Sequence, residues 1–120
     1  HGDINLVTAL PRATAPGLQV RTAEGWIDAT PPDGSAIVNT GMMLEHFSNG
    51  RLPTGIHRVV ASPEQEGARI AVVQFCHPTP STMLAPLASC IDAATQKVSR
   101  SGRKSSSRVQ ALLGWRWSIQ

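Results

Sequence analysis

Turn-forming residues interrupt this chain at short, regular intervals, and that spacing constrains its fold more than any other feature. Residues 24–25, 30–34 and 48–50 each predict a turn, because proline fixes φ and glycine permits a positive φ. Such signals recur about every 8–12 residues, a spacing typical of all-β sandwiches and barrels. We therefore expect an all-β fold.

Short apolar runs between these turns indicate where the strands lie. Residues 18–21 alternate apolar and polar side chains, as a half-buried strand does. Residues 56–61 and 70–76 are rich in β-branched side chains, which is typical of sheet interiors, whereas residues 42–47 predict a short helical turn. Further strands are expected at residues 26–27 and 36–38 and in the apolar stretch that Pro11 ends.

Charge divides the chain into two unlike parts. The whole chain has a net charge of +3, yet residues 1–92 hold five arginines, no lysine and eight acidic residues, which gives −3. Residues 93–120 hold six basic residues, many serines and no acid. We therefore expect a domain at 1–92 and a basic, serine-rich tail at 93–120 that is disordered or partly helical. Because the serine- and basic-rich stretch at residues 99–108 holds no aromatic residue, a solvated tail is favoured over a nucleic-acid partner.

The cysteines and the apolar runs bear on the compartment. Cys76 and Cys90 form no CxxC pair, which fits a reduced, cytoplasmic protein. No run approaches the ~18 apolar residues of a membrane span, so no membrane partner is expected. Since the chain begins at His1, we expect either that residues were removed upstream or that the chain is a fragment.

One pattern suggests a metal centre. In a strand, side chains at positions i and i+2 share a face, so His1-Gly2-Asp3 would place an imidazole beside a carboxylate. His57 from a neighbouring strand would complete two nitrogens and one oxygen on one face of a metal, the ligand set of non-haem Fe(II) oxygenases. The pattern alone leaves two alternatives: His57 as a hydrogen-bonded structural histidine, and a copper site formed by the amine and ring of His1.

The surrounding residues favour the iron site. The sequence closely resembles the isopenicillin N synthase-like family of Fe(II)/2-oxoglutarate dioxygenases from His1 to about Asp92. The resemblance rests on residues 1–8, 17–20, 26–41, 44–45, 48–51 and 57–60. It implies a double-stranded β-helix, or jelly-roll, of which residues 1–92 would form an incomplete C-terminal part.

The resemblance also implies roles for individual residues. His1, Asp3 and His57 would bind Fe(II), and Arg69 would bind the distal carboxylate of 2-oxoglutarate with its planar guanidinium. The family usually has an Arg-x-Ser motif there, whereas this chain has Ala71 in place of serine. The lost hydroxyl contact would weaken cosubstrate binding by roughly 1–3 kcal/mol.

These features together predict an enzyme. The expected function is an Fe(II)- and 2-oxoglutarate-dependent dioxygenase, present as a C-terminal fragment, that uses dioxygen to oxidise a small organic substrate. The first alternative is a catalytically inactive orphan half-domain that acts as a structural or interaction module. The second is an N-terminal-histidine copper monooxygenase.

Overall fold

Two small antiparallel sheets dominate the described part of the chain. The computed structural model describes residues 1–61 and 63–91, and the chain divides into two units, His1–Cys90 and Ile91–Gln120. The tail expected at residues 93–120 lies outside the described residues. Both sheets belong to the first unit.

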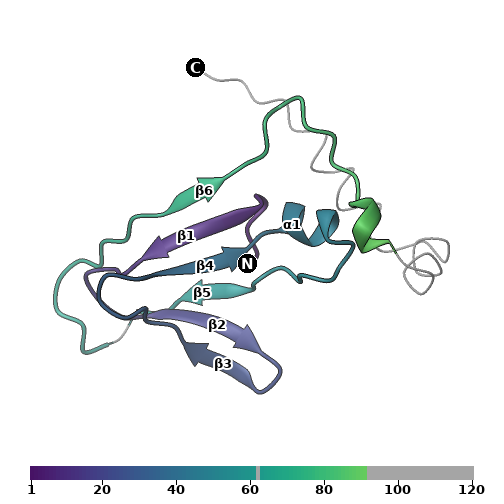
Figure 1. Cartoon of the computed structure of the whole chain (residues 1–120). Coiled ribbons are helices and arrows are strands. Elements are labelled where there is room, and N and C mark those ends of the chain that lie inside the picture. Colours follow the sequence, from purple (N-terminus) through teal and green to yellow (C-terminus); the bar gives the residue numbers. More distant parts are fainter. Residues whose placement is uncertain (62, 92–120) are drawn as a thin grey trace. The chain divides into compact units, whose positions relative to one another are not determined.

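The first sheet has the strand order β4-β1-β6 (Figure 1). Its central strand, β1 (Val7–Pro11), pairs antiparallel with β4 (Ala36–Thr40) on one side and with β6 (Gln74–Cys76) on the other. Thr8 of β1 lies opposite Asn39 of β4. Side chains directly opposite in a pair point to the same face of a sheet, so these two polar side chains share one face.

The second sheet has the strand order β3-β2-β5. Its central strand, β2 (Leu18–Thr22), pairs antiparallel with β3 (Gly25–Asp28) and with β5 (His57–Val59). The hairpin between β2 and β3 closes at Gly25, whose φ of 128° is accessible to glycine and strained for other residues. His57 therefore enters the structure on an edge strand of this sheet.

Within residues 1–61 and 63–91, two short helices accompany the sheets: α1 (Met42–Phe47), directly after β4, and the 3-10 helix η1 (Ala88–Cys90). The carboxylate of Glu45 in α1 accepts a hydrogen bond from the backbone N–H of Thr54 at 2.8 Å. This bond fixes the segment that leads into β5. No helix among the described residues is long and apolar enough to cross a membrane.

The interior of the described part is polar. Leu18 is its one buried large hydrophobic side chain, whereas six buried side chains are polar: Asp3, Asn5, Thr8, Asn39, Ser48 and His57. Many apolar side chains are exposed, Val59 and Val72 by 57% and 69%. The described unit is therefore organised around a polar cluster rather than an apolar core.

Most of the expected elements are confirmed, including the strands around residues 18–21, 26–27 and 36–38 and the helical turn at 42–47. The expectation that residues 56–61 and 70–76 are sheet interiors was wrong. Their strands are only His57–Val59 and Gln74–Cys76, and each pairs with a single neighbour at the edge of its sheet. β-branched side chains favour strands, but they do not determine whether a strand has a paired neighbour on one side or on both.

Candidate metal centre

Residues 3–6 are held against the start of α1 by backbone hydrogen bonds. The N–H of Met42 donates to the carbonyl oxygen of Asp3 at 2.8 Å, and the N–H of Gly41 donates to that of Leu6 at 2.9 Å. Gly41 permits this approach, because a Cβ there would overlap the carbonyl oxygen of Asn5. The position of Asp3 is thus fixed before β1 begins.

His1 is held against β5 in a similar way. The N–H of His57 donates to the carbonyl oxygen of His1 at 3.0 Å, and the amino nitrogen of His1 donates to the carbonyl oxygen of His57 at 3.0 Å. Their ring centroids lie 4.5 Å apart at an interplanar angle of 60°. The two imidazoles are therefore neighbours although they are far apart in the sequence.

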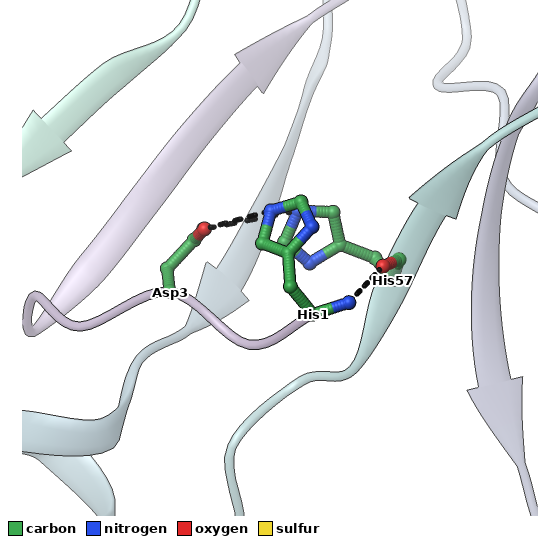
Figure 2. A group of neighbouring side chains, drawn as sticks. All are labelled: His1, Asp3 and His57. Carbon is green, nitrogen blue, oxygen red and sulfur yellow. Dashed lines mark hydrogen bonds and ion pairs between the residues drawn. The ribbon is translucent and has the colours of Figure 1, made fainter.

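The three predicted ligand residues converge (Figure 2). Oδ1 of Asp3 lies 3.5 Å from Nε2 of His1 and 3.8 Å from Nε2 of His57, and one donor atom from each residue lies within 4.8 Å of the other two. The Asp3 and His57 side chains are buried, whereas that of His1 is 71% exposed. The cluster therefore opens to solvent on the side of His1.

These donor atoms suit a divalent transition metal. Two imidazole nitrogens and one carboxylate oxygen form the facial ligand set that leaves positions open on non-haem Fe(II). Adjacent ligands of an octahedral ion bound at about 2.1 Å lie roughly 3 Å apart, so the observed spacing is slightly wider than that of a bound set. The expectation that His1 and Asp3 share a strand was wrong, since residues 1–3 precede β1 and belong to no strand. The His1 and Asp3 side chains converge because the segment before β1 is bonded to His57 at its start and to Gly41 and Met42 at its end.

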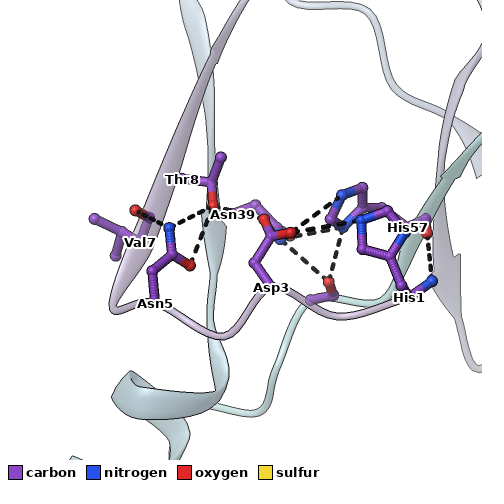
Figure 3. Close-up of polar contacts among 8 residues, drawn as sticks. His1, Asp3, Asn5, Val7, Thr8, Asn39 and His57 are labelled. Carbon is purple, nitrogen blue, oxygen red and sulfur yellow. Dashed lines mark hydrogen bonds and ion pairs between the residues drawn. The ribbon is translucent and has the colours of Figure 1, made fainter. Parts of the chain in front are cut away.

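A second layer of polar side chains surrounds Asp3 and His57 (Figure 3). The hydroxyl of Thr8 donates to Oδ2 of Asp3 at 2.6 Å and accepts from Nδ2 of Asn5 at 2.9 Å. Nδ2 of Asn39 lies 3.4 Å from Oδ2 of Asp3 and 3.3 Å from Nδ1 of His57. The sequence pattern assigned no role to Thr8 or Asn39, and the only signal was their place within the segments of family resemblance.

Arg69 faces the same cleft as the three clustered side chains. The cleft has a volume of about 370 Å³ and is lined by both sheets, with Ala71 in its wall as well. Nε of Arg69 donates to the carbonyl oxygens of Ala15 and Pro16, both at 3.1 Å. Within the described part of the chain, no residue bonds to its Nη nitrogens, so they are available to a ligand. The structure thus brings all four predicted site residues to one cleft.

Sequence comparisons identify relatives of this chain. Residues 1–78 match the family described as the 2OG-Fe(II) oxygenase superfamily. Leucoanthocyanidin dioxygenase 1 of Oryza sativa subsp. indica is 34% identical over 84 residues, which are 70% of this chain and 22% of the relative. Isopenicillin N synthase of a Flavobacterium species is 42% identical over 59 residues, 49% of this chain and 18% of the relative. This chain thus spans about a quarter or less of these curated relatives.

Solved structures give the same assignment. A 2OG-Fe(II) oxygenase family protein of Caulobacter crescentus superposes with a TM-score of 0.75 and 33% identity, over 94% of this chain and 38% of the other. The dioxygenase for auxin oxidation 1 of Arabidopsis thaliana, in complex with 2-oxoglutarate, superposes with a TM-score of 0.70 and 26% identity, over 79% and 36%. The expected jelly-roll is confirmed as a partial domain. By its sequence and its fold, the chain belongs to the 2OG-Fe(II) oxygenase superfamily.

Proposed function

We propose that this chain forms the metal- and 2-oxoglutarate-binding part of an oxygenase that oxidises a small organic molecule. The observation that carries the proposal is the convergence of His1, Asp3 and His57 on a cleft that also contains Arg69. Membership of the superfamily supports both Fe(II) and 2-oxoglutarate as the bound groups.

Three side chains would hold the metal. His1 and His57 would each supply a ring nitrogen and Asp3 one carboxylate oxygen, a ligand set that suits Fe(II). The bound Fe(II) and 2-oxoglutarate supply the oxidising chemistry, in which oxidative decarboxylation of the cosubstrate accompanies oxidation of the substrate. The chain's own task is to bind and orient these groups.

Arg69 would bind the distal carboxylate of the cosubstrate. Its two bonds to the carbonyls of Ala15 and Pro16 fix the guanidinium through Nε, which leaves the two Nη nitrogens for a bidentate contact. Because Ala71 lacks a hydroxyl, the binding free energy at this end of the cleft would come mainly from Arg69.

Apolar side chains would limit water around the reacting groups. Leu10, Leu18, Val59 and Phe75 from both sheets line the cleft beside the metal ligands. Excluding water strengthens electrostatic interactions inside a site and suppresses side reactions. The same walls favour an organic substrate with an apolar part.

Anaerobic absorption spectroscopy tests the proposal. Addition of 2-oxoglutarate to the chain with Fe(II) should produce a metal-to-ligand charge-transfer band, which His57→Ala and Asp3→Ala should abolish. No band at millimolar cosubstrate would refute the proposal for this chain and favour the inactive half-domain. Tight Cu(II) binding that is lost when the amine of His1 is acetylated would instead favour the copper monooxygenase.

A further inference from the structure

The two buried ligand residues, Asp3 and His57, are connected through one amide side chain. Asn39 lies on β4 opposite Thr8 of β1, and its Nδ2 contacts Asp3, His57 and the carbonyl oxygen of Gly55. Asn39 and Thr8 are both buried, so solvent does not readily replace these contacts. Figure 3 shows this cluster beside the three ligands.

On the Asp3 side, the contacts distinguish the two carboxylate oxygens. Oδ2 accepts a hydrogen bond from Thr8 Oγ1 at 2.6 Å and lies 3.4 Å from Nδ2 of Asn39. Oδ1 is directed to the two histidine rings. Because Oδ2 is held by protein donors, Asp3 is arranged to present a single oxygen to a metal.

On the His57 side, the contacts select one ring nitrogen. Nδ1 of His57 and Nδ2 of Asn39 both lie 3.2 Å from the carbonyl oxygen of Gly55. A carbonyl oxygen only accepts hydrogen bonds, so in the tautomer that bonds to Gly55 the proton lies on Nδ1 and the lone pair on Nε2. Nδ2 of Asn39 is itself a donor, so in this tautomer it packs against Nδ1 of His57 and forms no hydrogen bond with it. Nε2 is the nitrogen that faces Asp3, and a metal-bound histidine is commonly oriented by such a bond from its other nitrogen.

Gly55 allows Asn39 to reach this position. A Cβ on Gly55 would overlap Oδ1 of Asn39 and lie 2.8 Å from its Cγ. The amide therefore packs directly on the glycine, with one N–H available to the Gly55 carbonyl and the other to Asp3. The two hydrogens of Nδ2 match the two acceptors around it.

We propose that Asn39 and Thr8 are positioning residues. Both hold Oδ2 of Asp3, so that Oδ1 is presented to the metal, and Asn39 also packs the His57 ring so that Nε2 is presented. This inference rests on the proposed function, because it requires Asp3 and His57 to be ligands. Without the amide, Oδ2 of Asp3 keeps only the hydrogen bond from Thr8, and the His57 ring loses the neighbour that packs it against Gly55. Both changes lower metal affinity and alter the coordination geometry.

Co(II) binding by the full 120-residue chain tests the proposal without catalytic turnover. Titration calorimetry measures the affinity, and the visible d–d absorption per bound ion reports the geometry. Asn39→Leu, which keeps the branching at Cγ but removes the amide, and Thr8→Val, which removes the hydroxyl, should each weaken Co(II) binding by about 10–100-fold and change the absorption. Thr8→Ser should bind within about threefold of the unsubstituted chain, since it retains the hydroxyl.

A matched control separates positioning from general loss of structure. Ser48→Ala removes another buried hydroxyl, which bonds to Glu45 and Leu52 near the end of α1, and it should leave the Co(II) absorption unchanged. Far-UV circular dichroism would establish that each variant is folded. If Asn39→Leu does not fold, the comparison of Thr8→Val with Thr8→Ser tests whether a hydrogen bond to Oδ2 of Asp3 positions this ligand.

The outcomes distinguish the two proposals. If the unsubstituted chain does not bind Co(II), or if Asp3→Ala binds it equally well, the proposed metal site is wrong and this inference falls with it. If Asp3→Ala abolishes binding while folded Asn39→Leu and Thr8→Val keep the original affinity and spectrum, only the positioning role is refuted.

Discussion

Replacement of Gly41 by alanine should both destabilise the fold and weaken metal binding. The added Cβ would overlap the carbonyl oxygen of Asn5 and lie 2.7 Å from its carbonyl carbon. Asn5 is 1% exposed, so its backbone has no free space into which to move. The backbone bonds from Gly41 to Leu6 and from Met42 to Asp3 would have to lengthen.

The expected cost follows from these contacts. Overpacking a buried position costs roughly 1–3 kcal/mol, and each weakened backbone hydrogen bond adds about 0.5–1.5 kcal/mol. With two such bonds, we expect Gly41→Ala to lower the free energy of unfolding by roughly 2–6 kcal/mol. Because Asp3 lies on the displaced segment, metal affinity should fall as well.

Urea unfolding followed by far-UV circular dichroism measures the stability, and Co(II) titration measures the affinity. Gly67→Ala is the matched control. Gly67 has a φ of 85°, and a methyl group added there would meet no heavy atom within 4 Å. Alanine at this position therefore costs only about 1–2 kcal/mol of backbone strain and should leave Co(II) affinity unchanged. A loss of stability for Gly41→Ala no larger than that of the control would refute the steric argument.

Three further predictions concern the cosubstrate and the surface. Arg69→Lys, which loses the bidentate fork, should raise the dissociation constant for 2-oxoglutarate by about 10–100-fold in the anaerobic Fe(II) titration; an unchanged constant would remove Arg69 from the site. Ala71→Ser should tighten 2-oxoglutarate binding by about 1–3 kcal/mol, whereas serine at the exposed Ala68 should not. The ion pair between Arg12 and Asp33 is largely exposed, so Asp33→Asn should change the free energy of unfolding in urea by less than about 1 kcal/mol. A larger loss would show that this surface ion pair contributes more to stability than its exposure predicts.

Local signals account for the parts of the fold that could be predicted. The alternating side chains of β2 and the glycine that closes its hairpin depend on near neighbours in the sequence, and both were found where expected. The length of β6 and the exposure of its neighbours depend on which strands pair with it. Pairing is a long-range property that β-branched composition does not encode.

The candidate site shows the same difference between what local sequence signals predict and what depends on strand pairing. The sequence pattern selected His1, Asp3 and His57, and the family resemblance added Arg69. The structure brings all four to one cleft; their binding roles stay predictions. The support from Asn39 could not be predicted, because it depends on the pairing register that places this residue opposite Thr8. A motif names candidate ligands, whereas the residues that orient them emerge only when the register is known.

The strand order of the two sheets has a consequence for how this chain behaves in solution. Within the described residues, β4 and β6 flank one sheet and β3 and β5 flank the other, and each of the four pairs with only one strand. An outer strand offers backbone donors and acceptors to any strand that arrives, including one from another molecule. Protein concentration therefore becomes an experimental variable, and affinities measured over a dilution series will separate the properties of a single molecule from those of an assembly.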